Sequence, residues 1–284
     1  MPLPSNFNFL TSILHEPIES TQIHHGDDFF VVEINHKWMF RFPRSQAAPA
    51  VLEIEKKFLA EFAPLSPVPI PVYEFQGSDF AGYRKIEGLL LSPSRYNALA
   101  FERRKRIVHQ ISAFLSVLHG FPVERARLMG MSVGWDGWRE NAFQTFKTEI
   151  ATRLSHKAIH NAMGCFEEIL SKTYNPVVIH GDFYPKDHLF FDPQQQELCG
   201  IIDFGDLTIE DPAIDLKNIL SSFGIEVLTE VLENYHGPAD AAMIERMRLL
   251  IRAEPLFDST YDVQFGYPGR LTHAIREIEA RFGR

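Results

Sequence analysis

VVIHGDFYPKDHLFFD, residues 177–192, begins as a short apolar strand and runs directly into a histidine, a glycine and an aspartate. The β-branched residues at 177–179 predict a strand, and the glycine that follows predicts a turn. A strand that ends on Asp182 would deliver its carboxylate to a loop on a rigid support, as binding and catalytic side chains are usually held. This segment therefore predicts a functional loop centred on Asp182.

A second strand end carries the same kind of motif. In IIDFGD, residues 201–206, Asp203 follows an apolar run and precedes Phe-Gly. Residues 188–202 read as a hairpin that would bring Asp182 and Asp203 side by side. Two neighbouring carboxylates repel each other, and the pKa of one rises unless a cation is present. A hard divalent metal is the natural partner, so we expect Asp203 to bind Mg²⁺ and Asp182 to accept a proton from a substrate hydroxyl.

The groups that complete a phosphoryl-transfer site lie near the N-terminus. Residues 29–42, FFVVEINHKWMFRF, form two β-rich runs around a polar turn, which predicts a hairpin. Phosphoryl transfer needs a metal, a carboxylate that orients the hydroxyl, and a cation that holds the phosphates. Arg41 in the second run is the candidate cation. On the helix predicted after Ser45, Glu55, or alternatively Glu53, would orient it.

The spacing of apolar residues divides the chain into two parts. Strand patterns dominate before a connector at residues 84–90, whereas helical spacing dominates after it, for example at 107–118. Strand-like runs return only around 177–203. We expect an α+β protein with a small β-rich lobe, residues 1–86, that binds nucleotide and ends in a hinge. A larger, mainly helical lobe, residues 87–284, would carry the catalytic and acceptor sites.

The composition is that of a folded, water-soluble protein. The 284 residues are 45% hydrophobic and 23% charged, which does not favour disorder. No apolar run approaches the roughly 18 residues of a membrane span, and the N-terminus lacks the features of a signal peptide. Cys165 and Cys199 stand alone, without C-x-x-C spacing, as expected in a reducing compartment. We expect a cytoplasmic monomer with no membrane partner.

The net charge of −9 disfavours nucleic acid as a partner. Nucleic-acid binders obtain much of their affinity by neutralising phosphates with basic residues. The basic run ERRKR at 102–106 opens a predicted helix and fits a solvated face. An acidic surface attracts cationic molecules, although mild acidity also aids solubility.

A row of carboxylates suggests where a cationic acceptor could bind. Glu254, Asp258 and Asp262 recur at every fourth position, with Pro255 near the expected start of their helix. This spacing places all three on one helix face, where they repel one another. Together with Asp206, beside the predicted metal loop, they would form an acidic acceptor pocket. An ordinary acidic surface is the alternative.

The motifs resemble those of the bacterial aminoglycoside phosphotransferases, small-molecule relatives of the protein kinases. The similarity rests on HGD at 180–182, DFGD at 203–206 and DPAIDL at 211–216. It continues in EINHKWMFRFPRS at 33–45 and in FAGYRKIEGLLLSP at 80–93, and so covers nearly the whole chain. The branch that phosphorylates the 2″-hydroxyl is the most similar. The resemblance implies a two-lobed, protein-kinase-like fold.

The resemblance also implies roles for the residues of the two loops. Asp182 would be the catalytic base and Asp203 a metal ligand. The position of the second metal ligand, usually asparagine, is open between Asp187 and His188, with His188 preferred. His180 and Asp215 would support the loops without contacting substrate.

The nucleotide would lie between the hairpin and the connector. Arg41 would hold its phosphates with Glu55 as partner, and its base would lie along Tyr83, Arg84 and Ile86. A bulky residue at the position of Tyr83 favours GTP in this family.

The chain departs from the family pattern at two places on the nucleotide side. Arg41 stands where many relatives have lysine, and the two side chains are not interchangeable. The glycine-rich loop is reduced to HHGDDFF, with Gly26 as its one glycine, and the two aspartates that follow would oppose a phosphate.

These features predict transfer of the γ-phosphate of ATP or GTP, with Mg²⁺, to a hydroxyl of a cationic small molecule. Aminoglycosides are the leading acceptor class. The alternatives are a kinase for another hydroxyl compound, such as a macrolide or an amino alcohol, and a nucleotide-binding protein that has lost catalysis.

Overall fold

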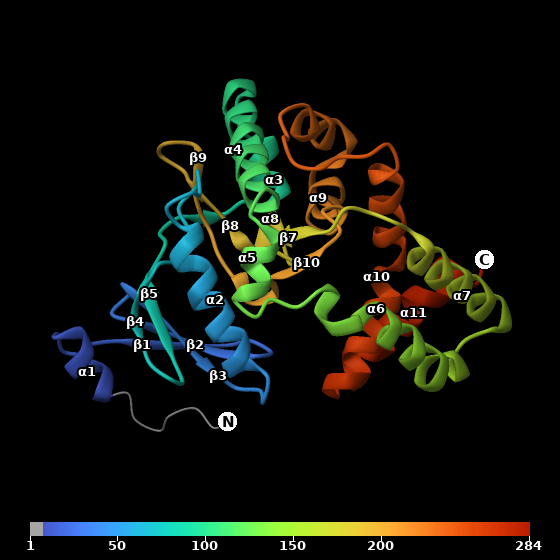
Figure 1. The fold of residues 1–284 in the computed structure, drawn as a ribbon, viewed down its shortest axis with the longest axis horizontal. Helices are drawn as coiled ribbons and strands as arrows, with labels where there is room; N and C mark the ends of the chain where they lie inside the picture. The colour runs from blue at the N-terminus through green and yellow to red at the C-terminus, as the bar shows by residue number, and fades with distance from the viewer. Residues whose placement is uncertain (1–7) are drawn as a thin grey trace.

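The structure, a computed structural model, describes residues 8–284 and consists of two lobes (Figure 1). The smaller is a five-stranded antiparallel sheet in the order β1-β2-β3-β5-β4, with helix α2 packed against it. The larger is mainly helical, so the predicted α+β class is confirmed. The boundary predicted at residue 86 stays a prediction; it falls between β5 and β6.

The elements of the smaller lobe follow one another closely along the chain. They are α1 (Asn8–Leu14), β1 (Thr21–His25), β2 (Phe29–Ile34), β3 (Trp38–Pro43), α2 (Ala48–Phe62), β4 (Tyr73–Gln76) and β5 (Ala81–Arg84).

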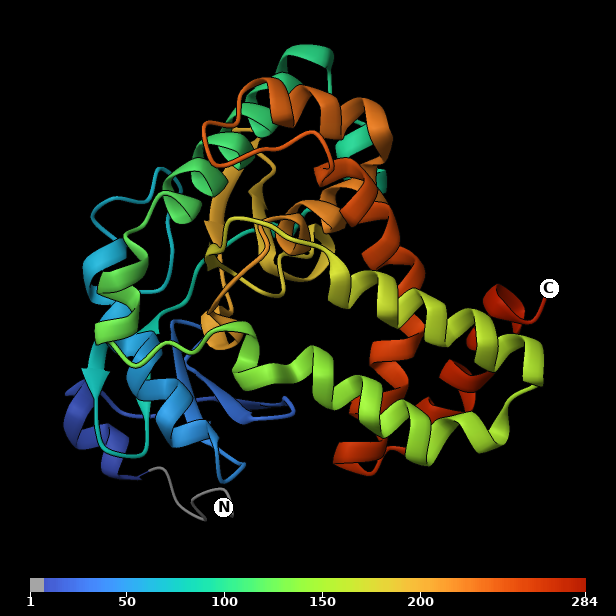
Figure 2. The same ribbon diagram turned by 45° about the vertical axis from the view of Figure 1, so that its right-hand side comes forward.

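The larger lobe continues to the last helix. Its elements are β6 (Leu89–Leu90), α3 (Pro93–Asn97), α4 (Phe101–His119), α5 (Val123–Leu128), α6 (Gly134–Thr145), α7 (His156–Ser171), β7 (Val177–Ile179), α8 (Pro185–His188), β8 (Leu189–Asp192), β9 (Glu197–Ile201), β10 (Thr208–Glu210), α9 (Ala213–Glu233), α10 (Met243–Phe265) and α11 (Pro268–Phe282). Helices α7, α10 and α11 pack together at the far end from the sheet (Figure 2). No helix of residues 8–284 is long and apolar enough to cross a membrane.

The predicted hairpin is formed by β2 and β3. Asn35 and His36 take left-handed backbone angles, with φ of 52° and 53°, and asparagine tolerates this conformation in turns. The Asn35 side chain also accepts hydrogen bonds from the backbone N–H groups of Glu19 and Ser20. Side chains alternate along β3, so Phe40 is buried in the core with Trp38 and Phe42 on the same face. The side chain of Arg41, between the two phenylalanines, therefore points to the opposite face and into the cleft.

The chain does not continue as one helix from α6 to α7. After α6 come a π turn, Phe146–Ile150, and a 3₁₀ turn, Ala151–Arg153. Leu154 is extended, and the hydroxyl of Ser155 accepts a hydrogen bond from Ala158 N–H to begin α7. A serine N-cap of this kind starts a new helix in place of continuing the old one.

The expectation that Pro255 lies near a helix start is wrong, because Pro255 is inside α10. Proline has no N–H, so the carbonyl four residues earlier, that of Ile251, loses its helical partner. The guanidinium of Arg281 in α11 donates to this carbonyl at 2.8 Å. The proline is therefore accommodated by a neighbouring helix.

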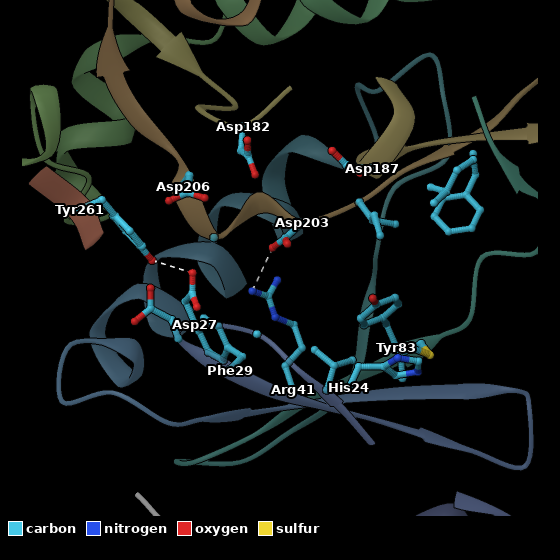
Figure 3. A pocket seen from close by; sticks show the side chains of 18 of the residues that line it. His24, Asp27, Phe29, Arg41, Tyr83, Asp182, Asp187, Asp203, Asp206 and Tyr261 are labelled. Carbon is cyan, nitrogen blue, oxygen red and sulfur yellow. Dashed lines mark hydrogen bonds and ion pairs between the residues drawn. The ribbon is translucent and has the colours of Figure 1, made fainter. Parts of the chain in front are cut away.

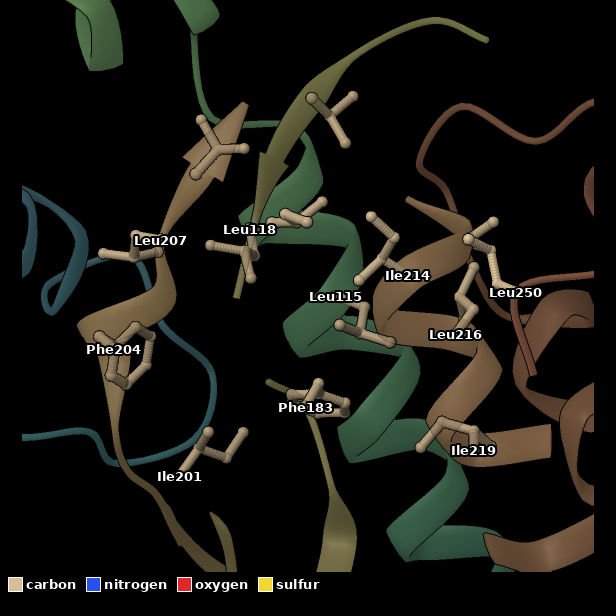
Figure 4. Close-up of a cluster of buried hydrophobic side chains, with 14 of the residues drawn as sticks. Leu115, Leu118, Phe183, Ile201, Phe204, Leu207, Ile214, Leu216, Ile219 and Leu250 are labelled. Carbon is tan, nitrogen blue, oxygen red and sulfur yellow. The ribbon is translucent and has the colours of Figure 1, made fainter. Parts of the chain in front are cut away.

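The core anchors both predicted loops through the residue that follows each aspartate. Phe183 and Phe204 are fully buried, and both lie in the cluster of buried side chains around α4 (Figure 4). Phe114 stacks on Phe183 with a ring-centre distance of 5.7 Å and packs edge-on against Phe204 at 6.4 Å. Burial of these rings fixes where Asp182 and Asp203 leave their strands.

Asp215, in the first turn of α9, supports the loop of Asp182, as expected. Its carboxylate accepts hydrogen bonds from the backbone N–H groups of His180 and Gly181, at 2.8 and 3.0 Å. It also lies 3.1 Å from Nε2 of the buried His119. Burial alone would raise the pKa of Asp215, but His119 and the backbone donors hold it below its usual value.

We predict that Asp215→Ala lowers the free energy of unfolding by about 3–5 kcal/mol at pH 7, since it leaves buried donors without a partner. The loss should shrink as the pH falls through the lowered pKa of Asp215, because the wild type then loses the same interactions. Urea unfolding followed by circular dichroism measures both. The exposed Asp79→Ala is the control and should change stability by less than about 0.5 kcal/mol; equal losses in the two variants would contradict the role given to Asp215.

Candidate active site

A cavity of about 800 Å³ lies between the lobes and is lined by side chains from both (Figure 3). The smaller lobe contributes β2, β3 and the loop before β2, and the larger lobe contributes the loops after β7 and β9 and the middle of α10. The cavity therefore brings together the two aspartates predicted from strand ends and the predicted arginine. These residues are Asp182, Asp203 and Arg41.

Arg41 connects three elements at the centre of this cavity. Its guanidinium lies 2.7 Å from Glu55 of α2 and 3.2 Å from Asp203, and it covers the ring of Phe29. Of the two candidate partners, Glu55 contacts Arg41, whereas Glu53 pairs with Lys56. Burial lowers the pKa of Arg41, but the two carboxylates outweigh it and raise the pKa well above its usual value. Arg41 Nε is buried without a hydrogen-bond partner among residues 8–284, so the guanidinium meets its partners through the two terminal nitrogens.

The surroundings push the pKa values of the two aspartates apart. For Asp182 burial is the largest influence and, with help from Asp203, raises the pKa in spite of His188. For Asp203 burial is again the largest influence, but Arg41 and His188 outweigh it and lower the pKa. Asp203 also takes a left-handed backbone, with φ of 67°, a strained conformation that recurs at functional sites. Diverging pKa values suit a proton acceptor beside a permanently charged metal ligand.

His180 joins the two loops from inside the core. Its Nε2 donates to the carbonyl of Ile202 at 3.0 Å, just before Asp203. Gly181 has φ of 89°, and a Cβ atom at this position would lie 2.2 Å from the carbonyl oxygen of Asp206. Only glycine therefore fits between the loops, which explains the HGD motif in physical terms.

Both candidates for the second metal ligand lie near the aspartates. His188 donates from Nδ1 to the carbonyl of Asp182 at 2.6 Å, which turns Nε2 toward the carboxylates of Asp182 and Asp203, 3.7 Å from each. Asp187 lines the cavity with an exposed carboxylate. No group of three histidine, cysteine or acidic side chains among the described residues is arranged to hold a metal by itself. Mg²⁺ needs only one or two protein carboxylates when water and substrate phosphates complete its shell, and the donors present fit such a site.

The four predicted acceptor carboxylates divide into two pairs. Asp206 and Asp258 line the cavity. Desolvation and the carboxylates of Asp182 and Asp203 raise the pKa of Asp206 to about 7. Desolvation, followed by Glu254, raises the pKa of Asp258 to about 6. A carboxyl group with a pKa this close to neutral pH is partly protonated, and a cation bound beside it would favour its charged form.

The other pair does not line the cavity. Glu254 accepts hydrogen bonds from the Tyr184 hydroxyl and from Lys217, at 2.8 and 2.7 Å. Asp262 is buried and pairs with Arg270 at 3.0 Å. Helical spacing placed Glu254 and Asp262 on one face of their helix. It did not predict that side chains from other parts of the chain would bind the two carboxylates.

Of the residues predicted to contact the nucleotide, some line the cavity and others do not. Tyr83 lines the cavity and packs edge-on against Tyr73. The side chains of Arg84 and Ile86 do not line it: Arg84 is exposed, and Ile86 packs on Gly200 of β9. Gly26 lines the cavity, although its N–H donates a hydrogen bond to the carbonyl of Phe29.

Three further residues line this end of the cavity and were missed. Lys85 pairs with Glu33 at 2.9 Å, and His24 lies beside them on β1. The alternation of β2 could have identified Glu33, since it shares a strand face with Phe29 and lies two positions beyond Val31.

The two-lobed fold, with paired aspartates at strand ends and a buried arginine across the cleft, defines a kinase-like phosphotransferase. The family model described as "Phosphotransferase enzyme family" (APH) matches residues 19–250. The chain belongs to this family, and the predicted resemblance to the aminoglycoside phosphotransferases is confirmed.

Solved structures share the fold over nearly the whole chain. The GDP and kanamycin complex of APH(2″)-IIIa has a TM-score of 0.85 at 24% identity, covering 97% of this chain and 98% of that one. The gentamicin complex of APH(2″)-IIa has a TM-score of 0.79 at 19% identity, with coverage of 98% and 96%. Macrolide 2′-phosphotransferase MphH from Brachybacterium faecium has a TM-score of 0.74 at 17% identity, with coverage of 97% and 98%. No curated protein sequence gives a significant match.

We predict that Arg41→Lys weakens nucleotide binding about tenfold or more, because an ammonium group cannot span Glu55 and a phosphate as the planar guanidinium does. Glu55→Gln should weaken it less, since the charge of Arg41 remains. Isothermal titration with ATP and GTP gives the dissociation constants. Arg84→Lys is the matched control, and an equal loss there would show that the assay does not report on the buried arginine.

Proposed function

We propose that this protein transfers the γ-phosphate of a nucleoside triphosphate to a hydroxyl of a cationic small molecule, with aminoglycosides as the leading class. The observation that carries the proposal is the pair Asp182 and Asp203, whose pKa values are displaced in opposite directions in a cavity that also holds Arg41. The relatives support the class of acceptor and donor, since one was solved with GDP and kanamycin and another with streptomycin and ATP.

Each residue has a defined task in this proposal. Asp182 accepts the proton of the acceptor hydroxyl, which its raised pKa assists. Arg41, oriented by Glu55, binds the donor phosphates. Asp203, with His188 or Asp187, would hold Mg²⁺, which neutralises phosphate charge when bound.

The donor base would lie against Tyr83. A bulky side chain at this position leaves less room at the inner end of the base site, which by resemblance favours GTP. Arg84 and Ile86 would then contribute through the connector backbone.

The acceptor would lie between Asp206 and Asp258. Trp138 and Phe257 stack with a ring-centre distance of 4.3 Å and line the same cavity. An aromatic wall beside carboxylates suits a ring that carries ammonium groups. The apolar part of this wall also makes a macrolide the second candidate.

We predict that Asp182→Asn lowers kcat about 10²–10⁴-fold and changes nucleotide affinity less than tenfold, because it removes the proton acceptor and keeps the shape. The assay pairs ATP or GTP and Mg²⁺ with several aminoglycosides, a macrolide and choline, and identifies products by mass spectrometry. Asp79→Asn is the control for the change of charge.

The outcomes of this assay separate the alternatives. Phosphorylation of a macrolide or choline alone would contradict the acceptor class. Nucleotide binding without any modified acceptor would favour the binding-only alternative. Full activity in Asp182→Asn would contradict the role of the base.

We predict a pH profile that follows Asp182. A base is active when it has lost its proton, so kcat/KM should fall as the pH drops through the raised pKa of Asp182. The acid limb should therefore lie above about 3.9, the ordinary aspartate value. Initial rates at saturating Mg²⁺, with circular dichroism to verify folding, test this; constant activity down to about pH 4 would contradict it.

A further inference from the structure

The loop that should cover the donor phosphates is tied to the opposite lobe. Asp27, between β1 and β2, accepts hydrogen bonds from the hydroxyls of Tyr261 and Tyr267, at 2.9 and 2.8 Å (Figure 3 shows the first). The two phenols use different carboxylate oxygens, Oδ2 and Oδ1. Arg270 lies 3.8 Å from the same carboxylate. We call Asp27, Tyr261, Tyr267 and Arg270 the interlobe latch.

The larger lobe holds its half of the latch in a built arrangement. Gly266, with φ of 73°, ends α10 in a left-handed turn, and the N–H of Tyr267 donates to the carbonyl of Asp262. This turn places Tyr267 beside Tyr261 at the start of α11. The buried carboxylate of Asp262 holds Arg270, whose guanidinium lies over both phenol rings, 5.6 and 4.9 Å from their centres. These phenols are therefore held in place by contacts within the larger lobe.

The charge of Asp27 needs an explanation at this place in the fold. A carboxylate in the loop above the phosphate site repels the donor. In the latch, both carboxylate oxygens are directed toward the larger lobe, where they accept hydrogen bonds from the two phenols and face the positive charge of Arg270. The hydrogen bond with Asp27 raises the pKa of Tyr267, and burial followed by the same contact raises that of Tyr261. Both phenols therefore stay protonated and remain donors at neutral pH.

We propose that Asp27 is a positioning residue that closes the β1–β2 loop over the cleft by binding Tyr261 and Tyr267. The inference rests on the proposed function, because the loop closes over the donor site and α10 carries the acceptor site. The closed loop thereby contacts α10, the helix that carries Asp258. The latch thus replaces the interactions that a glycine-rich loop makes through its backbone with side-chain contacts to the other lobe.

A direct electrostatic role for Asp27 predicts the opposite sign. If Asp27 acted only as a negative charge near phosphate, Asp27→Ala would tighten nucleotide binding. The latch requires that Asp27→Ala weaken it, because the loop then opens. Asp28→Ala is the matched control: it removes the same charge from the neighbouring cavity-lining residue, and should not weaken binding.

The test uses Tyr261→Phe, Tyr267→Phe, their combination, Asp27→Ala and the triple variant. The double tyrosine variant should raise the nucleotide dissociation constant and KM about tenfold, the range expected when hydrogen bonds to a charged group are lost. Adding Asp27→Ala to it should change the dissociation constant less than about twofold, since coupled residues are not additive. Tyr96→Phe, which removes a phenol outside the cleft, should match the wild type.

Hydrogen exchange of residues 24–30 in the nucleotide-free protein tests the latch without any reaction. Exchange should quicken in the double tyrosine variant and in Asp27→Ala, but not in Tyr96→Phe. Unchanged exchange, or tighter nucleotide binding in Asp27→Ala, would overturn the proposal. A wild type that transfers no phosphate would instead overturn the proposed function, and the exchange measurement would still decide on the latch.

Discussion

The cleft depends on the guanidinium of Arg41, which lies between Glu55 and Asp203. A buried charge is costly unless it is paired and hydrogen-bonded, so this arginine constrains three elements at once. Strand β3 supplies the cation, α2 one carboxylate, and the loop after β9 the other. Because Asp203 belongs to the larger lobe, the same interaction fixes the distance between the lobes at the centre of the cavity.

A second constraint comes from the core of the larger lobe. Phe183 and Phe204 are buried directly after the two aspartates, while His180 and Asp215 satisfy the backbone between the loops. The loops can therefore hold carboxylates at a short separation without relying on a bound ligand. Burial raises the pKa of Asp182, and repulsion by Asp203 adds a smaller contribution.

Local patterns were sufficient for the parts of the site that belong to single elements. Turn residues and alternation predicted the hairpin of Arg41, and apolar runs ending in aspartate predicted both loops. The failures involve partners that are distant in sequence. Helical spacing showed that Glu254 shares a helix face with Asp258, but not that Lys217 would pair with the carboxylate of Glu254. Likewise, local rules place Pro255 at the start of a helix. In the structure it lies inside α10, because Arg281 donates a hydrogen bond to the carbonyl that the proline leaves without a helical partner.

In the proposed function, the groups for phosphate transfer and those that face the acceptor belong to different parts of the structure. Asp182 and Asp203 are anchored by buried rings that pack against α4, whereas Asp258 is an exposed position on the cavity face of α10. A substitution at Asp258 would change the charge that faces the acceptor and would leave the packing of those buried rings unaltered. Under the proposed function, acceptor range can therefore change by single substitutions on α10, while the residues that move the phosphate stay the same.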